Sequence, residues 1–230
     1  MLQPKTIQNK YSLLLFTLIL LFIIGPFFTG IIGQIVTELL FFGIILSIIR
    51  TFNLPKKNFF LYVGLAGLAF FFNIISDIYI LSQGLESNFD KLLILISDLI
   101  NSVFIILALL SINKKLFLIQ KVNNNIIRGG IAVFLLIGLL WTFIYHIIFL
   151  LDPNAFSYSR ELQELQEEYN YLFYFSFTTL TTLGYGDVTP INQFAMNLTN
   201  LEAIVGMMYP SIFIARLVSL YTADELKERN

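Results

Sequence analysis

Residues 178–190 of the chain read Thr178-Thr179-Leu180-Thr181-Thr182-Leu183-Gly184-Tyr185-Gly186-Asp187-Val188-Thr189-Pro190. The apolar and aromatic segment 169–183 leads into this stretch, but it is too short to cross a bilayer. The two glycines that follow it do not continue a helix. The pattern predicts a re-entrant helix that enters the membrane and returns as an extended strand. Such irregular backbone is tolerated only where protein or a water-filled path surrounds it.

Long apolar segments fill most of the remaining sequence. The chain has 230 residues, of which 57% are hydrophobic and 13% are charged, whereas about 25% of a soluble domain is charged. A bilayer core about 30 Å thick requires about 20 apolar residues in a helix. The sequence therefore predicts an all-α integral membrane protein. Its six transmembrane helices are expected over residues 11–28, 31–49, 59–81, 92–112, 129–151 and 194–221.

Positive charge is distributed unevenly between the loops that join these segments. With both termini in the cytoplasm, 12 of the 14 lysines and arginines lie on the inner side, and Lys91 and Arg160 lie outside. The positive-inside rule favours this orientation in a plasma membrane or a bacterial inner membrane. It puts the re-entrant segment on the outer face. A cleaved signal peptide is the alternative for the first segment, but no small-residue cleavage site follows residues 25–28.

The stretch 178–190 resembles the end of the pore helix, the selectivity filter and the filter exit of the potassium-channel superfamily. The resemblance extends over about residues 129–221, and Leu183 stands where valine or isoleucine is commoner in the family. Potassium channels surround the ion with rings of backbone carbonyls that replace its hydration water. The resemblance implies that Asp187 lies at the outer mouth and that K+ is coordinated by Thr182, Leu183, Gly184, Tyr185 and Gly186.

Two residues of the last apolar segment occupy the place of a gating hinge in that family. Gly206 follows the filter by about twenty residues, and Pro210 lies one turn further on. Close helix packing is an equal alternative for Gly206, because small residues let membrane helices approach. Since the chain carries one filter sequence, a fourfold carbonyl cage requires four chains. We therefore expect a homotetramer with closed fourfold symmetry.

The four segments within residues 11–112 lack the charges of a conventional voltage sensor. The fourth segment, 92–112, contains no lysine or arginine and carries Asp98 instead, whereas a voltage sensor moves arginines through the membrane field. Residues 113–128 form a basic cytoplasmic linker, for which a helix along the inner surface and a solvated loop are both open. Residues 1–10 and 222–230 are expected as short cytoplasmic ends without a ligand-binding domain.

Acidic residues inside predicted spans are costly and are functional candidates by default. At about 1.5 Å per residue, Glu38, Asp77 and Asp98 lie roughly 6–10 Å below the outer ends of their helices. The sequence offers no basic partner for them within the spans. We hypothesise one outward-facing crevice in which they sense protons or cations. The alternative is three separate acids, each protonated or bonded to a polar neighbour.

Two further polar residues lie in the pore segments. Glu202 precedes Gly206 by one helical turn and is a candidate contact at the base of the pore helix, behind the filter. A polar contact between inner helices is its alternative. His146, near the outer end of the fifth segment, is expected to be a packed residue at the membrane interface rather than a pH switch.

Several function classes are disfavoured by composition. The net charge is −1, cysteine is absent and one histidine is present, so we expect no nucleic-acid partner, no metal centre and no cofactor besides potassium ions. We find no nucleophile and base pair and no phosphate loop, so we expect no enzyme. The alternatives to a potassium channel are a poorly selective cation channel, a non-conducting regulatory protein and a transporter subunit, which would carry four pore loops instead of one.

Overall fold

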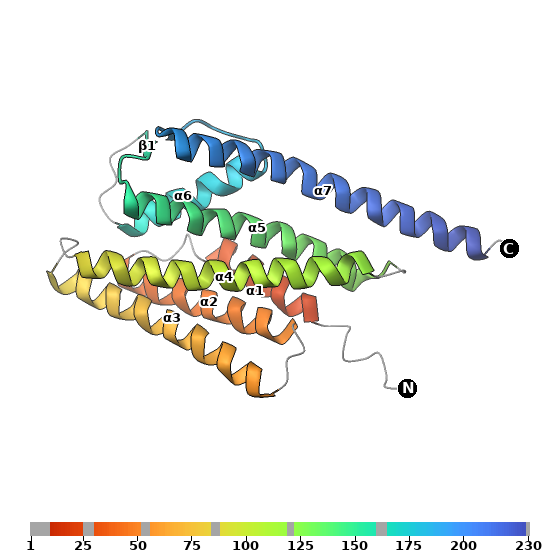
Figure 1. Ribbon diagram of the computed structural model, residues 1–230, viewed down its shortest axis with the longest axis horizontal. Helices are drawn as coiled ribbons and strands as arrows, with labels where there is room; N and C mark the ends of the chain where they lie inside the picture. The colour runs from red at the N-terminus through yellow and green to blue at the C-terminus, as the bar shows by residue number, and fades with distance from the viewer. Residues whose placement is uncertain are drawn as a thin grey trace.

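The computed structural model describes residues 10–24, 30–51, 56–83, 88–118, 122–159 and 165–228 of the chain. Seven helices and two short strands occur within these ranges (Figure 1). They are α1 (Lys10–Ile24), α2 (Gly30–Thr51), α3 (Lys56–Gln83), α4 (Asn88–Leu118), α5 (Asn124–Leu151), β1 (Phe156–Tyr158), α6 (Leu165–Leu180), β2 (Val188–Pro190) and α7 (Gln193–Glu228).

A helix stands at each position where the sequence predicts a span, and α6 occupies the place of the re-entrant helix. Three stretches of the described chain are helical, long and apolar enough to cross a membrane: Lys91–Leu118, Asn124–Leu151 and Gln193–Leu226. Within the same part of the chain, α1 and a segment of α3 are shorter apolar helices. The crossing of the membrane by the first three segments stays a prediction.

Helix α4 continues six residues into the predicted linker 113–128. Lys114 and Lys115 do not end it, because Lys115 extends its side chain and donates from Nζ to the carbonyl oxygen of Thr51 at 2.6 Å. The next helix begins at Asn124, where the side chain of Asn123 accepts from the backbone N–H groups of Asn125 and Ile126, both at 3.0 Å. This asparagine cap fixes the start of α5. Residues 119–123 are therefore all that separates the two helices.

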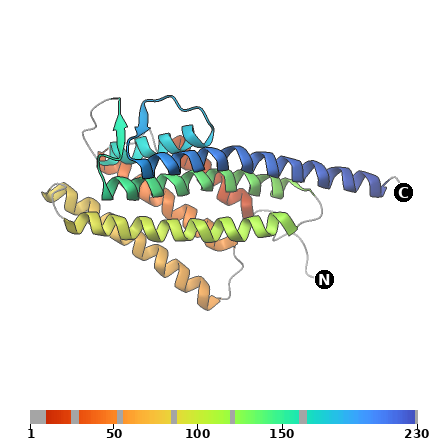
Figure 2. The ribbon, with the colours of Figure 1, turned by 45° about the horizontal axis from the view of Figure 1, so that its top comes forward.

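The helices form two groups that share α5. Helices α1 to α4 pack into a bundle on one side of α5, and α6 and α7 pack on the other (Figures 1 and 2). Strands β1 and β2 pair antiparallel, with Tyr158 opposite Val188, close to the C-terminal end of α5. The C-terminal end of α7 extends beyond the other helices in both views.

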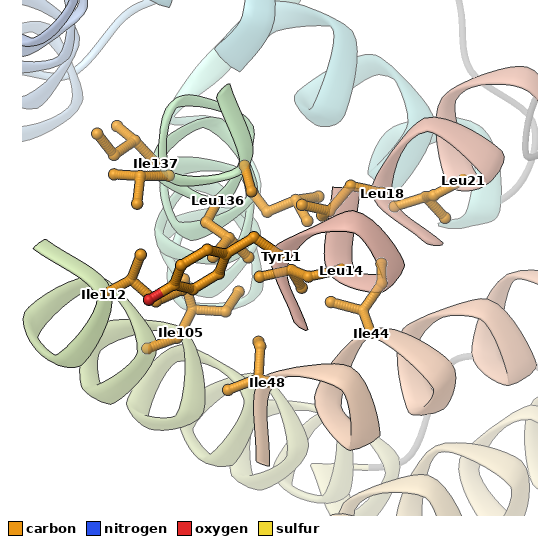
Figure 3. Packing of buried hydrophobic residues seen from close by; sticks show 14 of the residues in the cluster. Tyr11, Leu14, Leu18, Leu21, Ile44, Ile48, Ile105, Ile112, Leu136 and Ile137 are labelled. Atoms are coloured by element: carbon orange, nitrogen blue, oxygen red, sulfur yellow. The ribbon is translucent and has the colours of Figure 1, made fainter. Parts of the chain in front are cut away.

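One apolar core joins the bundle to α5. Figure 3 shows Tyr11, Leu14 and Leu18 of α1 meeting Leu136 of α5, with Ile48 of α2 beside them. Lipid tails are as apolar as leucine, so shape-matched packing rather than transfer from water holds such helices together. The bundle therefore packs against α5 of its own chain.

Candidate functional site

The backbone of residues 182–186 has an alternating conformation. Thr182, Gly184 and Gly186 have positive φ values of 60°, 54° and 82°, and the residues between them do not. Alternation between left-handed and right-handed backbone turns successive carbonyls toward the same side, whereas they would alternate in an ordinary strand. Glycine adopts the left-handed region without penalty, but a β-branched residue such as Thr182 is an outlier there. Strain of this kind, about 1–3 kcal/mol per residue, persists only where the surroundings impose it.

Hydrogen bonds to the end of α6 impose this conformation. The N–H of Thr182 donates to the carbonyl of Thr179 at 2.9 Å. The N–H groups of Leu183 and Gly184 both donate to the carbonyl of Thr178, at 2.8 and 3.2 Å. In the described part of the chain, no backbone N–H donates to the carbonyls of residues 182–186. Residues 181–186 are also exposed, so these oxygens are free to bind a cation.

The outer end of this stretch is anchored on three sides. The ring of Tyr185 stacks on Tyr174 of α6, with centroids 6.2 Å apart and planes 5° apart. The side chains of Tyr174 and Asp187 share a hydrogen bond, and the carbonyl of Asp187 accepts from the N–H of Ser159 at 2.9 Å. The pairing of β2 with β1 adds a third attachment. Tyr185 thus braces the strand against α6, and Asp187 lies where the filter sequence ends.

Helix α7 packs against the end of α6 so closely that its backbone at Gly206 contacts the backbone of Leu180. A Cβ atom added at Gly206 would lie 1.9 Å from the carbonyl oxygen of Leu180. No other residue fits at this crossing, so the packing role of Gly206 has a direct structural basis. Its role as a hinge stays a prediction. Pro210 lies within α7, which continues through it to Glu228.

A hydrogen-bonded cluster lies behind the filter, where α5, α6 and α7 meet. Glu202 of α7 is fully buried. One of its carboxyl oxygens, Oε1, lies 2.6 Å from Oγ of Ser176 in α6, and Oε2 lies 2.5 Å from the hydroxyl of Tyr145 in α5. Oγ of Ser176 also lies 2.8 Å from the carbonyl oxygen of Gly138. We call these four residues the Glu202 cluster. Glu202 therefore contacts the pore helix one turn before its end.

Asp98 has a basic partner that the sequence analysis missed. Its Oδ2 lies 2.7 Å from Nδ1 of His146 in α5, and both side chains are buried. The expectation that no basic residue within the spans could pair with an acid is therefore wrong. Both residues lie five or six positions from the outer ends of their predicted spans. Because adjacent helices run antiparallel, equal depth was the signal that could have paired them.

The three acids of the hypothesised crevice have different surroundings. Asp98 pairs with His146, whose ring meets Tyr169 edge-on at 5.2 Å and 86°. Tyr169 also interacts electrostatically with Glu38, so Glu38 lies on the same side of the bundle. Asp77 lies in α3, and its side chain is outside the described residues. Within the described part of the chain, no group of three side chains could hold a metal ion.

Comparison with known proteins agrees with this geometry. A family model described as an ion channel matches residues 131–223, which take in nearly all of α5, the filter and most of α7. No curated protein and no solved structure matches the chain. The match and the long apolar helices place the protein in a membrane. The match contains residues 178–190 and supports the resemblance of this part of the chain, the pore module (α5 to α7), to the potassium-channel superfamily.

Proposed function

We propose that four copies of this chain form a potassium-selective channel that conducts K+ passively and is not conventionally voltage-gated. The carbonyls of residues 182–186 carry the proposal, because no backbone N–H of the described chain occupies their oxygens, and the residues that bear them are exposed. A potassium ion that loses its water requires such oxygens at close range. Thr182, the first residue of this stretch, adds its side-chain hydroxyl, and Asp187 follows the last residue.

The surface of α7 supports assembly of several chains. Its apolar side chains are largely exposed in the single chain, although α5 and α6 cover one face of the helix. The exposed members are Phe194, Met196, Leu201, Ile204, Met207, Met208, Ile212, Ile214, Val218, Tyr221 and Leu226. A second copy of α7 is the natural cover for such a surface, and the carbonyl column of one chain supplies only one quarter of a closed cage. Fourfold cyclic symmetry satisfies both requirements.

The charges of α4 support the absence of a conventional voltage sensor. Its lysines lie at the ends of the helix, at Lys91, Lys114 and Lys115. The acidic Asp98 between them is held by His146 of the pore module. A voltage sensor needs several cationic side chains within the membrane field. Voltage should therefore change the open probability only weakly.

Ion flux into liposomes that contain only the purified chain tests the proposal. We expect K+ flux to exceed Na+ flux strongly in the wild type and to lose this preference in Gly184→Ala. Gly184 has a φ of 54°, and a Cβ atom added to it would meet nothing within 4 Å, so alanine strains the backbone without a packing clash. A left-handed alanine costs about 1–2 kcal/mol in each of the four chains.

Gly64→Ala is the matched control. Gly64 also has open space around a Cβ, but it lies in the regular helix α3. This variant should conduct like the wild type. Equal K+ and Na+ flux in the wild type would point to a poorly selective cation channel. Absence of flux at every pH and voltage would favour a regulatory subunit instead.

A further inference from the structure

The hydroxyl of Ser176, behind the filter, has one hydrogen but lies within hydrogen-bonding distance of two oxygen atoms. Oγ of Ser176 lies 2.8 Å from the carbonyl oxygen of Gly138 and 2.6 Å from Oε1 of Glu202. A serine hydroxyl has a single hydrogen, and a carbonyl can only accept. An ionised Glu202 could also only accept. One of the two short contacts would then join two oxygens with no hydrogen between them.

A proton on Glu202 satisfies every contact in the cluster. The carboxylic acid donates from Oε1 to Oγ of Ser176, and Ser176 donates its own hydrogen to the carbonyl of Gly138. The hydroxyl of Tyr145 donates to Oε2 at 2.5 Å. A chain of hydrogen bonds then runs from α7 through α6 to α5, and no buried donor is left without an acceptor.

The surroundings of Glu202 offer nothing to balance a negative charge. Tyr145 faces it from α5 and Ser176 from α6, and the hydroxyl of Thr199 in α7 donates to the carbonyl of Ala195 in its own helix. Among the described residues, no lysine, arginine or histidine interacts with this carboxyl group. An unpaired charge that is fully buried is strongly disfavoured, so such a group gives up its charge.

We infer that Glu202 is a neutral carboxylic acid whose proton joins the inner helix to the pore helix and so positions the filter. The inference rests on the proposed function only for its consequence in conduction. Loss of the proton at alkaline pH turns the Ser176 hydroxyl toward the carboxylate and breaks its bond to the Gly138 carbonyl, which keeps its bond from Thr142 of the same helix. The contact between α6 and α5 is then lost directly behind the filter strand.

Infrared difference spectroscopy of the purified channel tests the charge state without any need for conduction. The wild-type spectrum minus that of Glu202→Gln should contain the C=O band of a protonated carboxyl group at neutral pH. Glu225→Gln is the matched control, because Glu225 is exposed on the same helix; its difference spectrum should show an ionised carboxylate. Absence of the protonated band for Glu202 would overturn the inference.

Flux measurements across pH test the positioning role. A glutamine at position 202 donates from its amide to Ser176 and accepts from Tyr145, so Glu202→Gln should keep the K+/Na+ flux ratio constant from about pH 7 to about pH 10. The wild type should lose selectivity as pH rises through this range. Glu202→Ala should lower the ratio about tenfold at every pH, because two buried hydroxyls lose their partner.

The three variants separate failure of the inference from failure of the proposed function. If Glu202→Gln loses selectivity as Glu202→Ala does, the proton is not what positions the pore helix. If the wild type conducts no ions at all, the proposed function fails, and the infrared band still decides the charge state. If Glu202→Ala does not fold, Glu202→Gln and the Glu225→Gln control still give both the infrared band and the pH dependence of the flux ratio.

Discussion

The pore module (α5 to α7) contains hydroxyl groups that bond from one helix to another, although Thr142 and Thr178 bond within their own helix, as Ser47 and Thr51 do in the bundle (α1 to α4). In the bundle, Ser47 and Thr51 bond to carbonyls of their own helix, at 2.9 and 2.7 Å. In the pore module, Ser176 reaches α5 and α7 from α6, and Tyr209 of α7 donates to the carbonyl of Gly130 in α5 at 3.1 Å. Hydroxyl groups thus join α6 and α7 to α5. The bundle helices are joined by apolar packing and by the bond from Lys115 of α4 to the Thr51 carbonyl of α2.

Polar contacts also connect the two regions, at opposite ends of the helices. The pair of Asp98 and His146 joins α4 to α5 in the N-terminal half of α4. Near the C-terminal end of α4, the guanidinium of Arg216 in α7 donates to the carbonyl of Phe117 at 3.3 Å. Movement of α4 relative to the pore module must therefore strain or break one of these links.

The largest contrast between the regions should come from the same substitution made in each. Gly206→Ala places a methyl group 1.9 Å from the carbonyl oxygen of Leu180 and should lower the free energy of unfolding by about 3 kcal/mol or more. Gly43→Ala in α2 meets nothing within 4 Å and should raise it by about 0.5–1 kcal/mol, because alanine favours the helix. Denaturant unfolding in detergent measures both. Equal effects of the two substitutions would contradict the difference in packing.

A second test addresses the link between the regions. Asp98→Ala leaves the buried His146 without its partner and should cost about 3 kcal/mol of unfolding free energy. The double variant Asp98→Leu, His146→Phe should be close to the wild type, because apolar residues of similar size often replace a buried pair without loss. A phenylalanine also keeps the ring contacts with Phe149 and Tyr169. Additive losses in the double variant would show that the two residues act separately.

The sequence predicts the parts of this structure that depend on local pattern. Apolar runs place the helices, and the two glycines around Tyr185 place the filter, because both signals need only neighbouring residues. The pairing of Asp98 with His146 joins positions 48 residues apart. This pairing depends on which helices become neighbours in the fold, and the pattern of neighbouring residues in one sequence does not determine that.

The end of α4 shows a related difficulty. Lys114 and Lys115 interrupt the apolar run, so hydropathy ends the span at residue 112. The structure continues the helix because a long lysine stem lies along apolar surface while its charged end reaches a polar group, here the Thr51 carbonyl. The partners of Glu202 illustrate the same limit. The position of Glu202 in the sequence, one helical turn before Gly206, predicts its contact with the pore helix. Its contacts with Tyr145 and, through Ser176, with the Gly138 carbonyl depend on the tertiary fold.

The smallest expected effect concerns Glu168, which lies near the N-terminal end of α6, where the pore module meets the bundle. Burial raises the pKa of its carboxyl group from 4.5 to about 7, although the nearby His146 lowers it. The folded state therefore holds the proton more tightly than the unfolded state. Relative to Glu168→Gln, wild-type stability should be highest below about pH 4.5, fall between about pH 4.5 and about pH 7, and stay level above that.

Thermal unfolding of the wild type and Glu168→Gln over this pH range measures the difference directly. The change should be modest, because the side chain is only partly buried and solvent screens its charge. The exposed Glu225→Gln should show no such step. Repeating the measurement with His146→Phe should enlarge the step, because the imidazole no longer favours the ionised carboxylate. A step of unchanged size in that background would show that the charge of Glu168 is independent of His146.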